Sequence, residues 1–76
     1  MPPVVTAVKP EQDFFLTLQF SNGEIRRFDV KPYLTKGIFK EIKDVSKFHS
    51  VHTDGLGIEW ENEAALCPDT LYFGSV

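Results

Sequence analysis

Two runs of alternating apolar and polar residues flank a short polar turn near the start of the chain. The apolar positions of these runs are Phe14, Leu16, Leu18, Phe20, Phe28 and Val30. A period of two residues is typical of a strand with one buried face. The segment 14–30 is therefore predicted to be an antiparallel hairpin around the turn Ser21-Asn22-Gly23.

The length of this turn decides which residues of the hairpin face the core. A two-residue loop would pair Phe20 with Ile25 and turn the apolar residues of the second run away from those of the first. A three-residue loop, with Gly23 in a bulge at positive φ, would instead pair Phe20 with Glu24. A slip of one residue exchanges the two faces of a strand, so burial of the apolar residues favours the bulged form.

The bulged register predicts specific neighbours across the hairpin. Leu16 should pair with Phe28, and Phe14 with Val30, which places Phe28 and Val30 in the core. Ile25 then lies on the other face of the sheet. We expect that face to be partly covered.

Further elements follow from the same patterns. Residues 4–8 predict a first strand that ends at Lys9-Pro10. Ile38, Ile42 and Val45 form an i, i+4, i+7 stripe that predicts a helix, and Asp44 resembles an N-cap, so two short helices are expected. The segment 68–72 begins with proline and predicts a last helix, after which residues 74–76 should fray.

A second hairpin is expected between residues 48–53 and 57–61. Its register pairs Thr53 with Ile58, so Val51 faces Trp60 on the core side. His52 then faces Glu59 on the outer side. Together these elements predict an α+β fold: a small, mostly antiparallel sheet of about five strands with short helices on one side.

Length and composition indicate one small globular domain spanning 1–76. The chain has 76 residues, of which 42% are hydrophobic and 25% charged. A domain of this size buries only about 60% of its unfolded surface, so a protein partner or a homodimer would stabilise it. No apolar run approaches the roughly 20 residues of a membrane helix, and no signal peptide is expected, so the cytoplasm is the expected location.

Charge is unevenly distributed along the chain. The net charge of −3 divides into −2 for residues 1–24, +4 for residues 25–47 and −5 for residues 48–76. No lysine or arginine follows Lys47. Such segregation predicts a dipolar surface that could steer a charged partner.

Residues with reactive side chains do not form a recognisable catalytic or metal-binding motif. His49, His52 and Asp54 lie close in sequence, but alternation along a strand would turn the two histidines to opposite faces. Cys67 is the single cysteine, which excludes an internal disulfide, and we expect it to be buried as a small hydrophobic residue. We expect no enzymatic activity, no cofactor and no metal.

With these motifs in view, the chain resembles the bacterial domain-of-unknown-function family 2442. The matching motifs are Leu18-Gln19-Phe20-Ser21-Asn22-Gly23-Glu24, Phe28-Asp29-Val30, Pro32-Tyr33-Leu34, Gly37-Ile38-Phe39, Phe48, Gly57-Ile58-Glu59-Trp60 and Pro68-Asp69-Thr70-Leu71-Tyr72. The chain departs from the family pattern at Glu63, where relatives tend to have glycine, and at Ala65, where they tend to have aspartate. The resemblance implies an α+β domain and carries over no catalytic residue. It also implies that some relatives are fused to a helix-turn-helix and that many are encoded beside another very small protein in a toxin–antitoxin type of arrangement.

Protein binding is the leading functional hypothesis, with the chain as an antitoxin-like partner of another small protein. The candidate contacts are an unpaired sheet edge or the acidic residues Glu59, Glu61 and Glu63. The alternative is a nucleic-acid-associated regulator that uses the basic segment 26–47. Its candidate contacts are Arg26, Arg27, Lys36, Lys40, Lys43 and Lys47. For the four lysines, the solvated face of an amphipathic helix is the favoured interpretation.

Overall fold

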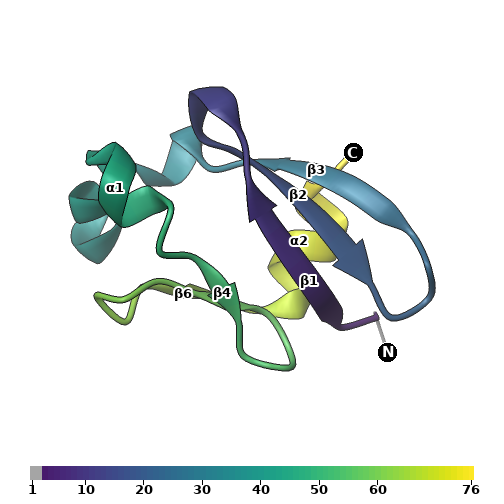
Figure 1. The fold of residues 1–76 in the computed structure, drawn as a ribbon. Helices are drawn as coiled ribbons and strands as arrows, with labels where there is room; N and C mark the ends of the chain where they lie inside the picture. The colour runs from purple at the N-terminus through teal and green to yellow at the C-terminus, as the bar shows by residue number, and fades with distance from the viewer. Residues whose placement is uncertain (1–2) are drawn as a thin grey trace.

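The computed structural model describes residues 3–76, which form two three-stranded antiparallel sheets and several short helices (Figure 1). The first sheet has the order β1-β2-β3, with strands Val5–Pro10, Phe15–Phe20 and Ile25–Asp29. The second has the order β4-β5-β6, with strands His52–Thr53, Ile58–Glu59 and Ala65–Leu66. The helices are the 3-10 helices η1 (Gln12–Phe14), η2 (Lys31–Tyr33) and η3 (Gly37–Lys43) and the α-helices α1 (Val45–Phe48) and α2 (Pro68–Gly74).

The predicted α+β class is confirmed, whereas the expected number of strands is not. Six strands in two sheets replace a sheet of about five strands. The additional strand is β6, which forms a third hairpin with β5. Helix α2 begins at the predicted proline and lies behind the first sheet in Figure 1.

The bulged register of the first hairpin is confirmed. The Phe20 amide donates to the Glu24 carbonyl at 2.9 Å, and Gly23 has a φ of 89°. Leu16 pairs with Phe28 as predicted. Both Phe28 and Val30 are buried.

The outer face of the first sheet is less covered than expected. Ile25 is 68% exposed, so the prediction of partial cover is wrong at this residue. Phe15 is half-buried because Arg27 and Lys31 lie over its ring, at 4.5 Å and 4.3 Å from the centroid. Cation–π contacts, rather than another layer of structure, cover this side of β2.

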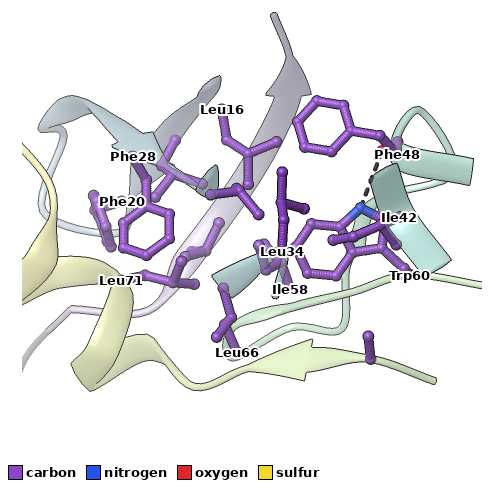
Figure 2. Close-up of a cluster of buried hydrophobic side chains, with 14 residues drawn as sticks. Leu16, Phe20, Phe28, Leu34, Ile42, Phe48, Ile58, Trp60, Leu66 and Leu71 are labelled. Carbon is purple, nitrogen blue, oxygen red and sulfur yellow. Dashed lines mark hydrogen bonds between the residues drawn. The ribbon is translucent and has the colours of Figure 1, made fainter. Parts of the chain in front are cut away.

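One core cluster joins the two sheets and α2 (Figure 2). Its buried members are Val5, Leu16, Leu18, Phe20, Phe28, Val30, Leu34, Ile42, Phe48, Ile58, Trp60, Ala64, Leu66 and Leu71. Trp60 is 1% exposed, and its indole Nε1 donates to the Phe48 carbonyl at 3.0 Å. The same side chain therefore fills the core and satisfies a buried carbonyl of α1.

The helical stripe predicted for residues 38–45 is wrong in its period. Ile38 and Val45 are 43% and 60% exposed, while Ile42 is buried and Phe39 packs against the core. The segment is the 3-10 helix η3, in which residues three apart lie on the same side, so Phe39 and Ile42 face inward together. The prediction of two short helices with an Asp44 cap is confirmed, because the Asp44 carboxylate accepts from the Ser46 amide at 3.0 Å.

The second hairpin is shorter than predicted but has the predicted register. Residues 45–48 form α1, so the strand does not begin at Phe48 and starts only at His52. Thr53 pairs with Ile58, and His52 pairs with Glu59.

Both edges of the first sheet carry backbone hydrogen bonds to other parts of the chain. On β1, the Val5 amide donates to the Leu56 carbonyl at 2.8 Å. On β3, Arg27 and Val76 exchange two backbone bonds of 2.9 Å and 3.0 Å. Val76 is therefore held against β3, which corrects the expected fraying, and neither edge of this sheet is fully open to strand addition.

Candidate functional site

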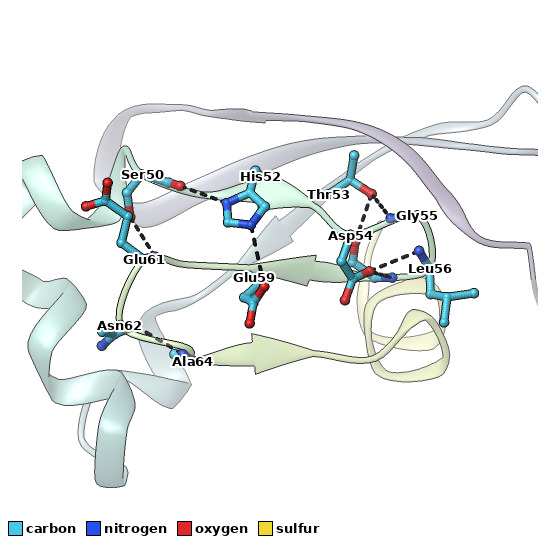
Figure 3. A network of polar contacts seen from close by, with 11 residues as sticks. Ser50, His52, Thr53, Asp54, Gly55, Leu56, Glu59, Glu61, Asn62 and Ala64 are labelled. Carbon is cyan, nitrogen blue, oxygen red and sulfur yellow. Dashed lines mark hydrogen bonds and ion pairs between the residues drawn. The ribbon is translucent and has the colours of Figure 1, made fainter.

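Two of the acidic residues predicted as partner contacts, Glu59 and Glu61, lie in the second sheet and in the turn after β5 (Figure 3). Strand pairing places His52, Glu59 and Ala65 in one row across β4, β5 and β6. His52 Nε2 lies 3.5 Å from Glu59 Oε1, and their side chains are 53% and 38% exposed. This is the predicted polar cross-strand pair, and Ala65 leaves the third position of the row without a charge.

Glu61 and Glu63 continue this face beyond β5. Glu61 is exposed, and its amide donates to the Ser50 hydroxyl at 3.2 Å, which ties the turn to the end of α1. Glu63 is exposed and has a φ of 72°. Within residues 3–76, neither carboxylate forms an ion pair. Of the three predicted acidic residues, Glu59 thus belongs to β5, whereas Glu61 and Glu63 belong to the turn that follows it.

The loop between β4 and β5 is held by Asp54. Its Oδ1 accepts from the Leu56 and Gly57 amides at 3.0 Å and 2.9 Å. These backbone donors hold the pKa of the Asp54 carboxyl below its usual value. The Leu56 carbonyl in turn accepts from Val5, so this loop attaches the second sheet to β1.

Stability should depend on pH through Asp54. A carboxyl whose pKa is lowered in the folded state stabilises the fold above its ordinary pKa of about 4. That contribution is lost as the pH falls below this value and through the lowered pKa. Asp54→Asn should therefore reduce the fall in stability on acidification, as measured by urea unfolding at pH 6 and at pH 3. The control Glu61→Gln removes a carboxylate whose side chain accepts no hydrogen bond within residues 3–76, and an equal effect of both variants would contradict the assignment.

A hollow of about 230 Å³ adjoins the acidic residues. It lies between η3, the end of α1 and the β5–β6 turn, and is lined by Glu41, Ile42, Lys47, Ser50, Glu61 and Asn62. Asn62 Nδ2 donates to the Ile38 carbonyl at 3.2 Å, which fixes the turn against η3. The acidic face is thus a rigid surface with a depression at one end.

The basic residues of the nucleic-acid alternative do not form one surface. Arg26 and Arg27 project to opposite faces of β3, because side chains alternate along a strand. Arg26 stacks over Tyr72 at 4.1 Å, donates to the Tyr72 carbonyl at 3.1 Å and pairs with Glu24 at 3.0 Å. Arg27 lies over Phe15 on the other face. Both arginines therefore cover aromatic rings of their own chain.

The four lysines lie away from these arginines, on or next to η3 and α1. Lys36, Lys40, Lys43 and Lys47 are all exposed. Lys36 lies 5.6 Å from the centroid of the Tyr33 ring. The set thus divides into an exposed lysine surface and two arginines that belong to the first sheet.

Cys67 is exposed, which corrects the prediction that it is buried. Leu66 points into the core, so alternation turns the next residue outward, and Cys67 lies at the start of α2. Its Sγ is 3.2 Å from the Thr70 hydroxyl, and this hydrogen bond lowers the pKa of the thiol.

His49 and His52 do not share a strand. His49 ends α1, and its Nδ1 donates to the Val45 carbonyl at 2.8 Å. In the part of the chain that the structure describes, no three His, Cys, Asp or Glu side chains come together as a metal site would require.

A second hollow, of about 320 Å³, was not predicted from the sequence. It lies between η1 and α1 and is lined by Pro10, Glu11, Gln12, Asp13, Phe14, Val45, Phe48 and His49. Its two walls are about 35 residues apart in sequence, so only the packing of α1 on η1 creates it. The local sequence feature that could have pointed to this hollow is the pair of acidic residues before Phe14, Glu11 and Asp13.

The fold and these surfaces define a small α+β domain built from two antiparallel sheets. The family described as "Protein of unknown function (DUF2442)" matches residues 5–76, and the chain belongs to that family. No curated protein and no solved structure matches the chain. Among the described residues, no helix is both long and apolar enough to cross a membrane.

Proposed function

We propose that this domain is a protein-binding module, acting as an antitoxin-like partner of another small, basic protein in the bacterial cytoplasm. The observation that carries the proposal is the outer face of the second sheet. Glu59 lies there, Glu61 and Glu63 lie in the turn directly after it, and within residues 3–76 the ion pair of Glu59 with His52 is the only one that any of the three forms. Like charges on neighbouring positions repel one another, and a basic partner would relieve that cost.

The rigidity of this face supports the same function. Glu59 is on the central strand of its sheet, and the following turn is tied to η3 and to Ser50. Binding therefore requires little ordering of the backbone, which keeps the entropic cost of association low. The adjoining hollow offers partly apolar surface beside the charges.

Part of the basic segment is already engaged within the domain. Arg26, Arg27 and Lys31 contact carboxylates or aromatic rings of their own chain, whereas Lys40, Lys43 and Lys47, like Glu61 and Glu63, form no ion pair within residues 3–76. The proposal assigns no reaction and no cofactor to the domain. The family context of neighbouring small proteins agrees with it by analogy only.

Co-expression with the product of the adjacent gene tests the proposal. The two chains should co-purify as a complex of fixed stoichiometry, measured by size-exclusion chromatography with light scattering. The affinity should fall as the salt concentration rises, because charged surfaces are screened. A lone, stable monomer that recruits neither the adjacent product nor any stoichiometric protein in the native host would contradict the proposal. Steeply salt-dependent binding of duplex DNA by the isolated domain would support the alternative instead.

A further inference from the structure

The hollow between η1 and α1 combines apolar walls with acidic residues. Phe14 and Phe48 meet edge to face with their ring centroids 5.1 Å apart, which closes the floor. Val45 lines the hollow and is 60% exposed. Its volume of about 320 Å³ falls at the lower end of the range of about 300–1,000 Å³ that ligand sites occupy.

Two carboxylates line this hollow, and no lysine or arginine does. Glu11 is half-buried; its Oε2 accepts from the Thr17 hydroxyl at 3.0 Å, and it forms no ion pair within residues 3–76. Asp13 pairs with Lys31 at 3.2 Å, but Lys31 is shared with Asp29, also at 3.2 Å. One cation therefore serves two carboxylates, and the hollow keeps an excess of negative charge.

The other polar side chains of the hollow are those of Gln12, which is uncharged, and His49. Its Nδ1 donates to the Val45 carbonyl, so this nitrogen is occupied within α1. The histidine thus does not neutralise Glu11 through that atom. A ligand that carries a positive charge on an apolar stem would therefore complement both the apolar walls and the carboxylates of the hollow.

We propose that this hollow binds an arginine side chain of the partner protein. The methylene groups would lie against Pro10, Phe14 and Val45, and the guanidinium would reach Glu11 at the acidic side. A guanidinium suits this place because it is weakly hydrated, stacks on aromatic rings and donates two parallel hydrogen bonds to a carboxylate. The chain already uses such stacking in the Arg26–Tyr72 and Arg27–Phe15 pairs.

This inference rests on the proposed function for the source of the arginine, but its test needs no partner. The probe is n-butylguanidinium, titrated into the 15N-labelled domain at low salt, with n-butanol as the uncharged control. The amide signals of Glu11, Val45 and His49 should shift and saturate at millimolar concentrations, and n-butanol should shift them far less.

Three variants test where the cation binds. Glu11→Gln keeps a group that accepts from Thr17 but removes the charge, and it should weaken probe binding at least about fivefold. Asp69→Asn makes the same change in net charge on α2, away from both surfaces, and should leave binding unchanged. Val45→Lys puts a cation at the hollow itself and should abolish binding; it also decides the matter should Glu11→Gln fail to fold.

The inference is overturned by any of three results: shifts that do not saturate, equal binding of n-butanol, or equal weakening by Glu11→Gln and Asp69→Asn. These results would leave the proposed function intact, because the complex with the partner is measured separately. Conversely, saturable probe binding with no partner complex would contradict the proposed function alone.

Discussion

Replacing Trp60 with alanine should destabilise the domain by about 3–5 kcal/mol. The indole is 1% exposed, lies against the rings of Phe39 and Phe48, and donates to the Phe48 carbonyl. Alanine removes the packing and the indole donor, which leaves the Phe48 carbonyl with the longer, 3.4 Å hydrogen bond from the Val51 amide. A domain of this length is expected to have a free energy of unfolding of about 4–11 kcal/mol, so the variant should lose a large part of that stability.

Chemical unfolding followed by circular dichroism measures this loss. The matched control is Phe73→Ala, since Phe73 is also aromatic but is 75% exposed, and it should cost less than about 0.5 kcal/mol. Trp60→Phe should fall between the two, because it keeps a ring but loses the indole donor. Similar unfolding midpoints for Trp60→Ala and Phe73→Ala would refute the position of Trp60 in the core.

Replacing Glu63 with glycine should raise the free energy of unfolding of the domain by about 0.5–1 kcal/mol. A non-glycine residue at positive φ destabilises the fold by about 1–2 kcal/mol, and glycine removes this cost. Part of the stability gained is offset because glycine has more conformational freedom in the unfolded chain. The φ of Glu63 is 72°, close to the 89° of Gly23 at the same place in the first turn. The reverse change, Gly23→Val, should cost about 2–3 kcal/mol, because a branched side chain tolerates this conformation poorly.

The control for this prediction lies in the same turn. Glu61 has the same side chain but a negative φ, so Glu61→Gly should destabilise the domain by about 0.5–1 kcal/mol. Thermal unfolding of the three variants beside the parent chain measures the differences. If Glu61→Gly and Glu63→Gly changed stability in the same direction, backbone strain at Glu63 would not be the cause.

The comparison of these two turns explains which hairpins the sequence reveals. Each turn follows a buried aromatic residue, Phe20 or Trp60, whose amide donates to the residue four positions later, at 2.9 Å and 2.8 Å respectively. In each, the asparagine at the centre accepts from the amide two residues on, at 3.0 Å and 3.1 Å. Only the first turn has glycine at the strained position. Because Glu63 stands where the first turn has glycine, the sequence lacks the usual turn signal between β5 and β6, and strand β6 was not predicted.

The helical segments were harder to predict because the spacing of apolar residues does not distinguish an α-helix from a 3-10 helix over seven residues. Ile38 and Val45 fit the α-helical period, yet the side chains that pack in or against the core are those of Phe39 and Ile42. The position of Val76 depends on a backbone pairing with a strand 49 residues earlier, which no local pattern reports.

The acidic face was predictable and the hollow beside η1 was not. Strand alternation alone places Glu59 and Glu61 on one side, and the register of the second hairpin places His52 opposite Glu59. Glu11 and Val45 become neighbours of one hollow only through the contact between Phe14 and Phe48. Long-range packing of this kind leaves no trace in the spacing of residues.

Calorimetric titration of the partner into two charge-reversed variants tests the central claim most directly. Glu61→Lys changes the acidic face, and Asp69→Lys makes the same change in net charge on α2; both residues are exposed. Glu61→Lys should weaken binding by about tenfold, whereas the affinity of Asp69→Lys should stay within about twofold of that of the parent chain. Equal affinities for the two variants, with both folded, would contradict the assignment of partner binding to the outer face of the second sheet.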